Sequence, residues 1–136
     1  MPYDFHWHDE EHTIIRFDIH GEVTWPLWYA AVDKVDEELE KVSHRVDLIF
    51  NDSVGLPKGN ALPHLKATSA KLIEHANMGL IVSVSPRPIS TFTKLMITIM
   101  SRVYGVDTSH SGGFVETMEQ ALALIAADRS NQDVAA

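Results

Sequence analysis

Polar residues that could do chemistry gather where an apolar segment of the chain ends. Residues 48–65, LIFNDSVGLPKGNALPHL, start as a buried strand and finish as the opening of a helix. Between the two, Asn51, Asp52 and Ser53 could contact a partner or a phosphate, or present a nucleophile. A serine nucleophile needs a base within hydrogen-bond reach, and no spacing rule links Ser53 to His64, the nearest histidine. The Gly-x-Ser-x-Gly pattern of a nucleophile elbow is missing as well. The segment therefore favours a binding loop or a simple turn over catalysis.

A second polar segment, SPRPIST at residues 85–91, follows the next apolar strand. Arg87 stands between two prolines, and a helix begins near Ile89 or Ser90. A guanidinium beside free helix amides can bind an anion, although the prolines could serve only to end the strand and start the helix. In open α/β sheets ligands prefer the carboxyl ends of parallel strands, where both segments would lie. The candidate partner- or ligand-binding residues are Asn51, Asp52, Ser53, Asn60, Ser85, Arg87 and Ser90.

Three histidines near the N-terminus could share one face of a hairpin. His6 and His8 are two residues apart on a predicted strand, and a turn at residues 9–11 would bring His12 opposite His8. Imidazoles arranged in this way suit zinc or nickel. The alternative is that they are exposed polar side chains of an edge hairpin. We adopt that alternative and expect no cofactor.

The segment ISTFTKLMITIMSRVYG spans residues 89–105. It predicts a helix over residues 89–104 with a wide apolar stripe. Core packing explains most of such a stripe. The surplus apolar surface, which includes two methionines, favours a homodimer or partner contact. The residues assigned to this surface are Phe92, Met96, Ile97, Met100 and Tyr104.

The elements that must position these residues are visible as hydrophobic periodicity. Residues 3–9 and 13–21 alternate apolar and polar side chains, which predicts two half-buried strands paired as an antiparallel hairpin. Thr24 and Pro26 open a helix. Its inward residues are expected to be Trp28, Ala31, Val32, Val35, Leu39 and Val42. The aromatic residues near its start, Trp25, Trp28 and Tyr29, could anchor that end or line a pocket.

The remaining elements alternate strictly between strand and helix. Residues 46–51 and 78–85 are short apolar runs typical of central strands covered on both faces. A second helix is expected over 61–76 and a last short strand over 112–116. A capping box formed by Thr117 and Gln120 starts the last helix. Its predicted core residues are Met118, Ala121, Leu122, Leu124 and Ile125.

This order predicts the α/β class. We expect one domain, over residues 1–128, in which a mixed sheet with an N-terminal antiparallel hairpin plus parallel strands packs with about four α-helices. Residues 129–136 are small and polar, and predict a disordered C-terminal tail.

Composition limits the function classes. The chain has 136 residues, of which 45% are hydrophobic and 22% charged, as in an ordinary globular domain. Its net charge of −8 argues against a nucleic-acid surface and against docking on anionic membranes. The absence of cysteine excludes disulfides and thiolate sites. No apolar run is long enough for a membrane span or a signal peptide. We therefore expect a cytoplasmic protein without membrane insertion.

The element order at this length resembles the STAS domain family (sulfate transporter and anti-sigma-factor antagonist) and its SpoIIAA-like relatives. The resemblance covers about residues 3–128, and the segments that carry it are TIIRFDIHGEVTWPLWYAAVDKVDEEL, VDLIFNDSVGLPKGNALPHL, MGLIVSVS and GGFVETMEQALALI. It implies a regulatory or protein-protein interaction module that is not an enzyme. Its partner would be another protein, a second copy of itself, or both.

One departure from the family pattern concerns the phosphorylated serine. Several anti-sigma-factor antagonists carry it in an Asp-Ser-Ser-Gly-Leu-like motif at the start of the helix after the signature strand. Here DSVGL, at residues 52–56, directly follows the strand, and the helix start reads KGNAL at 58–62. The resemblance therefore implies a divergent member. The alternative function is a small-ligand or anion-binding protein that uses the loops at the carboxyl ends of the parallel strands.

Overall fold

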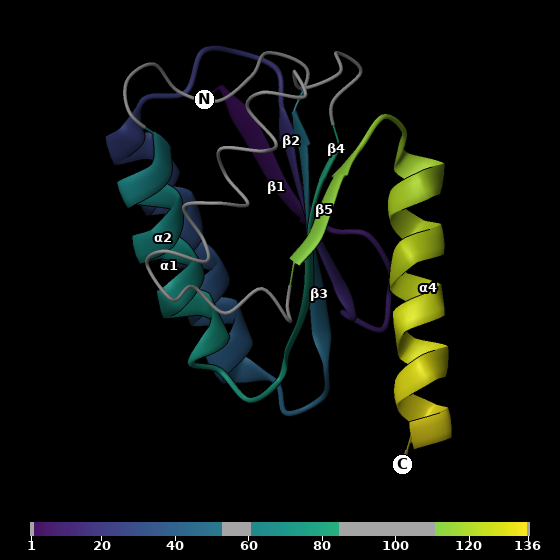
Figure 1. The fold of residues 1–136 in the computed structure, drawn as a ribbon. Coiled ribbons are helices and arrows are strands. Elements are labelled where there is room, and N and C mark those ends of the chain that lie inside the picture. Colours follow the sequence, from purple (N-terminus) through teal and green to yellow (C-terminus); the bar gives the residue numbers. More distant parts are fainter. Residues whose placement is uncertain (1, 53–60, 85–110, 136) are drawn as a thin grey trace.

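The chain folds as a mixed α/β domain, as the sequence predicts (Figure 1). A computed structural model describes residues 2–52, 61–84 and 111–135. The elements in these residues are β1 (Tyr3–Trp7), β2 (Ile14–Ile19), α1 (Trp25–Lys41), β3 (Val46–Asp52), α2 (Ala61–Ile73), β4 (Met78–Val84), β5 (Ser111–Val115) and α4 (Met118–Ala135). The helix expected over residues 89–104 lies outside the described residues. None of the helices that the structure describes combines the length and the hydrophobicity required to cross a bilayer.

The five strands form one sheet in the order β1-β2-β3-β4-β5. β1 is antiparallel to β2, and every other neighbouring pair is parallel. The connecting helices α1 and α2 lie on the same face of the sheet (Figure 1), which is the arrangement that right-handed crossovers give when successive strands are added in one direction. α4 follows the last strand and lies on the opposite face (Figure 1).

Each face of the sheet carries its own hydrophobic core. Under α1 and α2 the largest buried side chains include Phe17, Leu48 and Leu72, with the half-buried aromatics of β1 along the edge. Under α4, Ile49 and Val82 pack against Ile125. β3 and β4 are therefore apolar on both sides, whereas β1 and β2 contribute apolar side chains mainly to the first core.

Helix α1 follows its sequence pattern closely. Thr24 is the N-cap residue, Pro26 occupies the first turn, and the Trp28 amide donates to the Thr24 carbonyl at 2.9 Å. The cap is made by the backbone, since the Thr24 side chain bonds no helix amide. Five of the six predicted inward residues are buried, and Val42 packs partly against the same core.

The start of helix α4 is confirmed and two details of the helix differ. The Gln120 amide donates to the Thr117 hydroxyl at 3.1 Å, and the Thr117 amide donates to the Gln120 side chain at 3.2 Å, which completes the capping box. Leu124 was expected in the core but is 38% exposed. The helix also continues to Ala135, where the sequence predicts a disordered tail from residue 129. Arg129, the first residue of that predicted tail, pairs with the buried carboxylate of Asp47.

The β1-β2 hairpin turns without glycine. The Asp9 carboxylate accepts the amides of Thr13 at 2.8 Å and Ile14 at 3.2 Å, together with the Thr13 hydroxyl. His12 adopts the left-handed conformation, with φ 56°. That conformation costs roughly 1 kcal/mol for a residue with a Cβ. The cost is offset by the His12 ring, which stacks on Trp7 with centroids 4.5 Å apart.

Asp47 is the one charged residue among those described that is fully buried. Its carboxylate accepts Arg45 at 2.8 Å, Arg129 at 2.6 Å and the Leu80 amide at 2.7 Å. Arg45 also binds Asp128 at 2.7 Å. These four side chains, Arg45, Asp47, Asp128 and Arg129, form what we call the Asp47 network. Arg129 further donates to the Thr13 carbonyl at 3.1 Å, so the network joins α4 to the starts of β2 and β3.

The Asp47 network leaves room for glycine alone at position 79. A Cβ on Gly79 would lie 2.5 Å from Arg45 Nε and closer still to the Asp47 carboxylate. Side chains do not approach that closely, and here neither partner can move without losing an ion pair. Gly79 is therefore required by the buried charge beside it, while its backbone continues β4.

Replacing Asp47 should be strongly destabilising. In Asp47→Ala, Arg129 and the Leu80 amide lose their acceptor and Arg45 keeps only Asp128; breaking such a buried pair costs about 3 to 5 kcal/mol. Urea denaturation measures the loss in the free energy of unfolding. The control is Asp33→Asn, which removes an exposed ion pair with Lys71 on the helical face and should cost less than about 1 kcal/mol. Equal losses in the two variants would contradict the role given to Asp47.

Gly79→Ala should destabilise through steric conflict with the same network, by about 1 to 3 kcal/mol. Gly21→Ala is the matched control, because its Cβ would meet only Pro2 near the chain end, at 3.1 Å. Thermal unfolding followed by circular dichroism compares the two variants. A wild-type melting temperature in Gly79→Ala would show that the Asp47 network can accommodate a Cβ at position 79, which contradicts the close contacts found here.

Candidate functional site

The sheet carries a polar area beside helix α4. α4 packs over β3, β4 and β5, and in the described residues no helix covers β1 and β2 on that side (Figure 1). Because side chains alternate along a strand, the residues of β1 and β2 that do not face the first core point there. We call the following residues the polar face: Asp4, His6, His8, Arg16, Asp18, His20 and Asn51.

Asp18 is the centre of the polar face. Its carboxylate accepts hydrogen bonds from Arg16 at 2.9 Å and from Asn51 at 2.8 Å, and His6 Nε2 lies 3.3 Å from its other oxygen. Strand register explains the meeting, because Arg16 and Asp18 are two apart on β2 and Asn51 is the partner of Asp18 on β3. His6 lies opposite Arg16 on β1. Three strands therefore bring these side chains together near the carboxyl ends of β2 and β3.

The bonds around Asp18 decide its charge. Burial by itself would raise the pKa of this carboxyl, but the hydrogen bonds from Asn51 and Arg16 and the charge of Arg16 outweigh it. The net effect lowers the pKa of Asp18 below its ordinary value. At neutral pH the polar face thus has a fixed negative charge at its centre, with donors already directed toward it.

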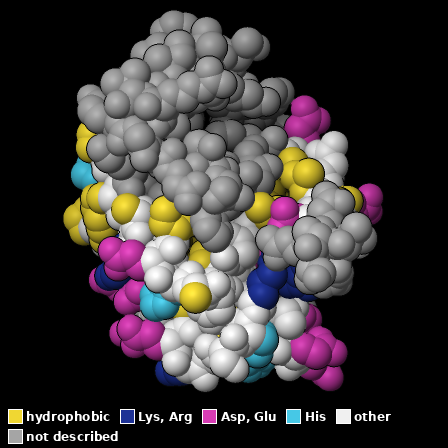
Figure 2. Space-filling view, turned by 60° about the horizontal axis from the view of Figure 1, so that its bottom comes forward, with side chains coloured by type: hydrophobic (Ala, Val, Ile, Leu, Met, Phe, Trp, Pro, Cys, Tyr) yellow, Lys and Arg dark blue, Asp and Glu magenta, His cyan; other side chains and the backbone are white. Residues whose placement is uncertain are grey.

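The rim of the polar face is more exposed and also paired. His20 lies 3.3 Å from the Asp4 carboxylate, and Arg16 approaches the His8 ring at 3.4 Å. Acidic, basic and histidine side chains are likewise interspersed over the described part of the molecule drawn in Figure 2. A surface of alternating sign suits a partner with complementary charges better than it suits a uniformly charged polymer.

The structure places only part of the predicted site. Asn51 lies on the polar face, bonded to Asp18. Asp52 ends β3, and its side chain is outside the described residues. Also outside them are the other predicted binding residues, Ser53, Asn60, Ser85, Arg87 and Ser90, and the predicted dimer surface, Phe92, Met96, Ile97, Met100 and Tyr104. The roles of these ten residues stay predictions.

The three hairpin histidines do not come together. His6 pairs with Asp18 and His8 meets Arg16, whereas the His12 ring stacks on Trp7, whose side chain belongs to the opposite face of the hairpin. The expected position of His12 opposite His8 was wrong, because Asp9 shapes a longer turn in which the His8 amide bonds Ile14. The three imidazoles are therefore not arranged as shared ligands, which was the alternative considered for them in the sequence.

Aromatic residues at the start of α1 anchor that helix to α2. His64 stacks on Trp25 with centroids 4.3 Å apart and bonds the Tyr29 hydroxyl at 2.9 Å. The Trp28 indole donates to Thr68 at 3.3 Å. Of the two sequence interpretations, anchoring is the one that these contacts support.

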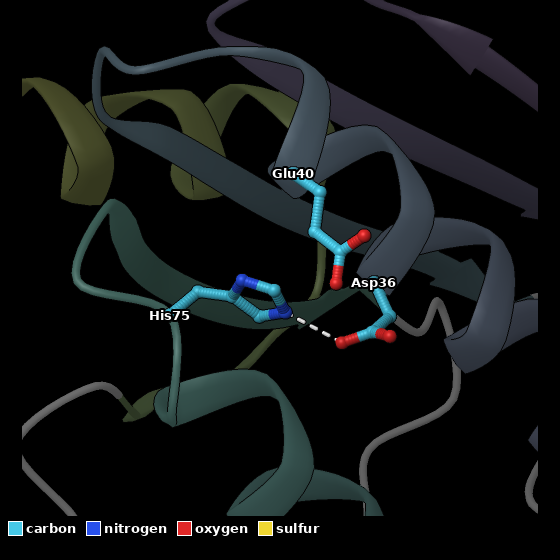
Figure 3. A group of neighbouring side chains, drawn as sticks. All are labelled: Asp36, Glu40 and His75. Carbon is cyan, nitrogen blue, oxygen red and sulfur yellow. Dashed lines mark hydrogen bonds and ion pairs between the residues drawn. The ribbon is translucent and has the colours of Figure 1, made fainter.

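Two groups of polar residues were missed by the sequence analysis. The Asp47 network is one of them. The other consists of Asp36, Glu40 and His75, where α1 meets the end of α2 (Figure 3). Asp36 and Glu40 lie on α1 outside the set of residues predicted to face the core. Their four-residue spacing, which puts both on one face of the helix, was the available signal.

No family model, curated protein or solved structure matches this chain. The polar face is therefore interpreted from its own geometry.

Asn51→Ala should raise the pKa of Asp18, because the amide that stabilises the carboxylate is lost. Carbon-detected NMR titration of the carboxyl groups measures the shift, which should move toward the ordinary value of about 3.9. Asp9 provides a control within the same spectrum. Burial raises its pKa, and the hydrogen bonds from Thr13 and Ile14 outweigh this effect, so its lowered pKa should not respond to Asn51.

Asn51→Ala should also change how the free energy of unfolding depends on pH. A carboxyl whose folded pKa is lowered stabilises the fold above its unfolded pKa, and this contribution disappears as the pH falls through the folded pKa. Between about pH 4 and pH 2, Asn51→Ala should therefore lose less stability than the wild type does. Identical acid profiles would show that Asn51 does not stabilise the charge.

Proposed function

We propose that this chain is a divergent STAS-like domain of the cytoplasm, which is not an enzyme and which acts by binding another protein through the polar face. The observation that carries the proposal is the half-buried cluster at Asp18, where Arg16 of β2 and Asn51 of β3 hydrogen-bond the carboxylate and His6 of β1 lies 3.3 Å from it.

The architecture supports the regulatory part of the proposal. The hairpin, the three parallel pairs and the single helix after the last strand follow the element order on which the family resemblance rests. Fold by itself never assigns an activity, and the binding role is supported by the polar face.

The shape and the charge of the polar face favour a protein partner over a small ligand. Small-molecule sites are concave and largely apolar, whereas this area is the outer side of two strands. Asp4 is 71% exposed and His20 55%, so the rim groups remain available for contact. Charges of both signs at fixed positions give specificity and orientation at an interface, and they exclude partners with the wrong pattern.

Ordered side chains also reduce the entropy lost on binding. Arg16 would lose rotamer freedom in an interface if it were mobile, at about 0.5 to 1.5 kcal/mol. Here Asp18 already fixes its guanidinium through two nitrogens. The polar face is thus organised before a partner arrives, which is the property expected of a recognition surface.

A pair of charge reversals tests the proposal. Asp4→Lys places a cation on the polar face, and Glu37→Lys makes the same change in charge on an exposed position of α1. The immobilised full chain is used to capture proteins from an extract of the source cells, and quantitative mass spectrometry compares the variants. We expect at least one protein to be captured about tenfold less by Asp4→Lys, equivalent to about 1.4 kcal/mol, and to be retained by Glu37→Lys.

Salt provides a second measurement of the same interaction. Capture by the wild type should weaken between about 50 mM and 500 mM salt, because rim charges are screened. If every captured protein responds equally to the two reversals, the polar face is not the working surface.

A further inference from the structure

Asp36, Glu40 and His75 bring three potential metal ligands together at the opposite end of the α1-α2 interface from the aromatic anchor. One carboxylate oxygen from each acid and one imidazole nitrogen all lie within 4.8 Å of one another. The Asp36 oxygen is 2.5 Å from His75 Nε2 (Figure 3). The carboxylates point from α1 toward the imidazole, which comes from the segment after α2.

Backbone structure brings these side chains together. Asp36 and Glu40 are one turn apart on α1 and so share a face. His75 lies in a tight turn in which its amide bonds the Leu72 carbonyl at 3.2 Å and its carbonyl accepts Met78 at 3.1 Å. Leu72 and Met78 are both buried in the first core, under α1 and α2, so that core fixes both ends of this turn.

Asn77 ties the same turn to the end of α1. The nitrogen of its side-chain amide, Nδ2, donates to the carbonyls of Leu39 at 3.1 Å, Val42 at 3.1 Å and His44 at 3.2 Å. These bonds satisfy carbonyls that a helix end leaves open. The segments that carry the two acids and the imidazole are therefore fixed relative to one another before any ligand binds.

We propose that Asp36, Glu40 and His75 form a zinc-binding site. Two carboxylate oxygens and one imidazole nitrogen are ligands that zinc accepts, and zinc holds them at about 2.0 to 2.2 Å. Tetrahedral ligand atoms then lie about 3.3 Å apart. The Asp36-His75 pair would open slightly as zinc replaces the shared hydrogen, and the Glu40 side chain, which is at the surface, would turn inward.

The charge of the surroundings supports a divalent cation. Asp36 and Glu40 contribute two negative charges, and the nearby Lys71 is bound by Asp33. The imidazole selects against magnesium and calcium, which prefer oxygen ligands throughout. Three protein ligands leave the fourth position for a water molecule or for an atom of a partner.

Calorimetric titration of the untagged full chain with zinc chloride tests the site. The wild type should bind one zinc ion per chain. His75→Gln and Glu40→Gln each remove one ligand, and each should weaken binding at least about 100-fold, since even partners outside the ligand set are worth 10- to 100-fold. The matched controls His20→Gln and Glu37→Gln remove an imidazole and a carboxylate elsewhere, and should bind as the wild type does. Circular dichroism confirms that each variant is folded.

Two further measurements make the outcome decisive. At a hundredfold excess of zinc over the Kd, the melting temperature of the wild type should rise by roughly 10 °C, and that of His75→Gln should not. Magnesium chloride at the same concentration should produce neither heat nor a shift. Undetectable zinc binding at millimolar concentration, equal binding by wild type and His75→Gln, or magnesium binding as tight as zinc binding would each overturn the proposal.

Discussion

The buried carboxylate of Asp47 is the constraint on which the arrangement of this fold depends. An isolated charge in a protein interior is prohibitively unfavourable, so Asp47 requires both guanidiniums and the Leu80 amide at once. Meeting that requirement sets the position of α4 over β3, β4 and β5. It also leaves the adjoining half of the sheet to polar side chains. The polar face around Asp18 is thus a consequence of where α4 is held.

The interface between α1 and α2 is bounded by polar contacts at both ends. At the start of α1, His64 joins Trp25 and Tyr29; farther along the helix, His75 joins Asp36 and Glu40. Between these two polar contacts, α1 and α2 pack through the apolar side chains of the first core. Apolar packing tolerates small slips between helices, whereas directional contacts at two separated points fix the register. Histidine suits both positions, since one ring can stack, donate and accept.

Local sequence patterns were sufficient to predict the strands and helices. They were not sufficient to predict which distant side chains meet at the sites. Period-two alternation predicted β1 and β2, three-to-four spacing predicted the buried side of α1, and Thr117 with Gln120 marked the start of α4. Those features depend on neighbours in the chain. The pairing of Asp47 with Arg129 spans 82 residues, and no local signal announces it. The same bond holds residue 129, where the sequence predicts that a tail begins. Asn51 lies near the end of β3, where the sequence places a polar residue, but its partner Asp18 becomes visible only through strand register.

The separation between Asp47 and Arg129 has a consequence for how the chain is made. Arg129 follows Asp47 by 82 positions, and at about 5 to 20 residues per second the ribosome adds that span in roughly 4 to 16 s. During that time β3 can pair and the layer of α1 and α2 can assemble, but the Asp47 carboxylate still lacks one of its two cations. Nascent chains must therefore keep that corner of the sheet hydrated until α4 emerges. Dehydration of this carboxylate thus waits for the synthesis of α4.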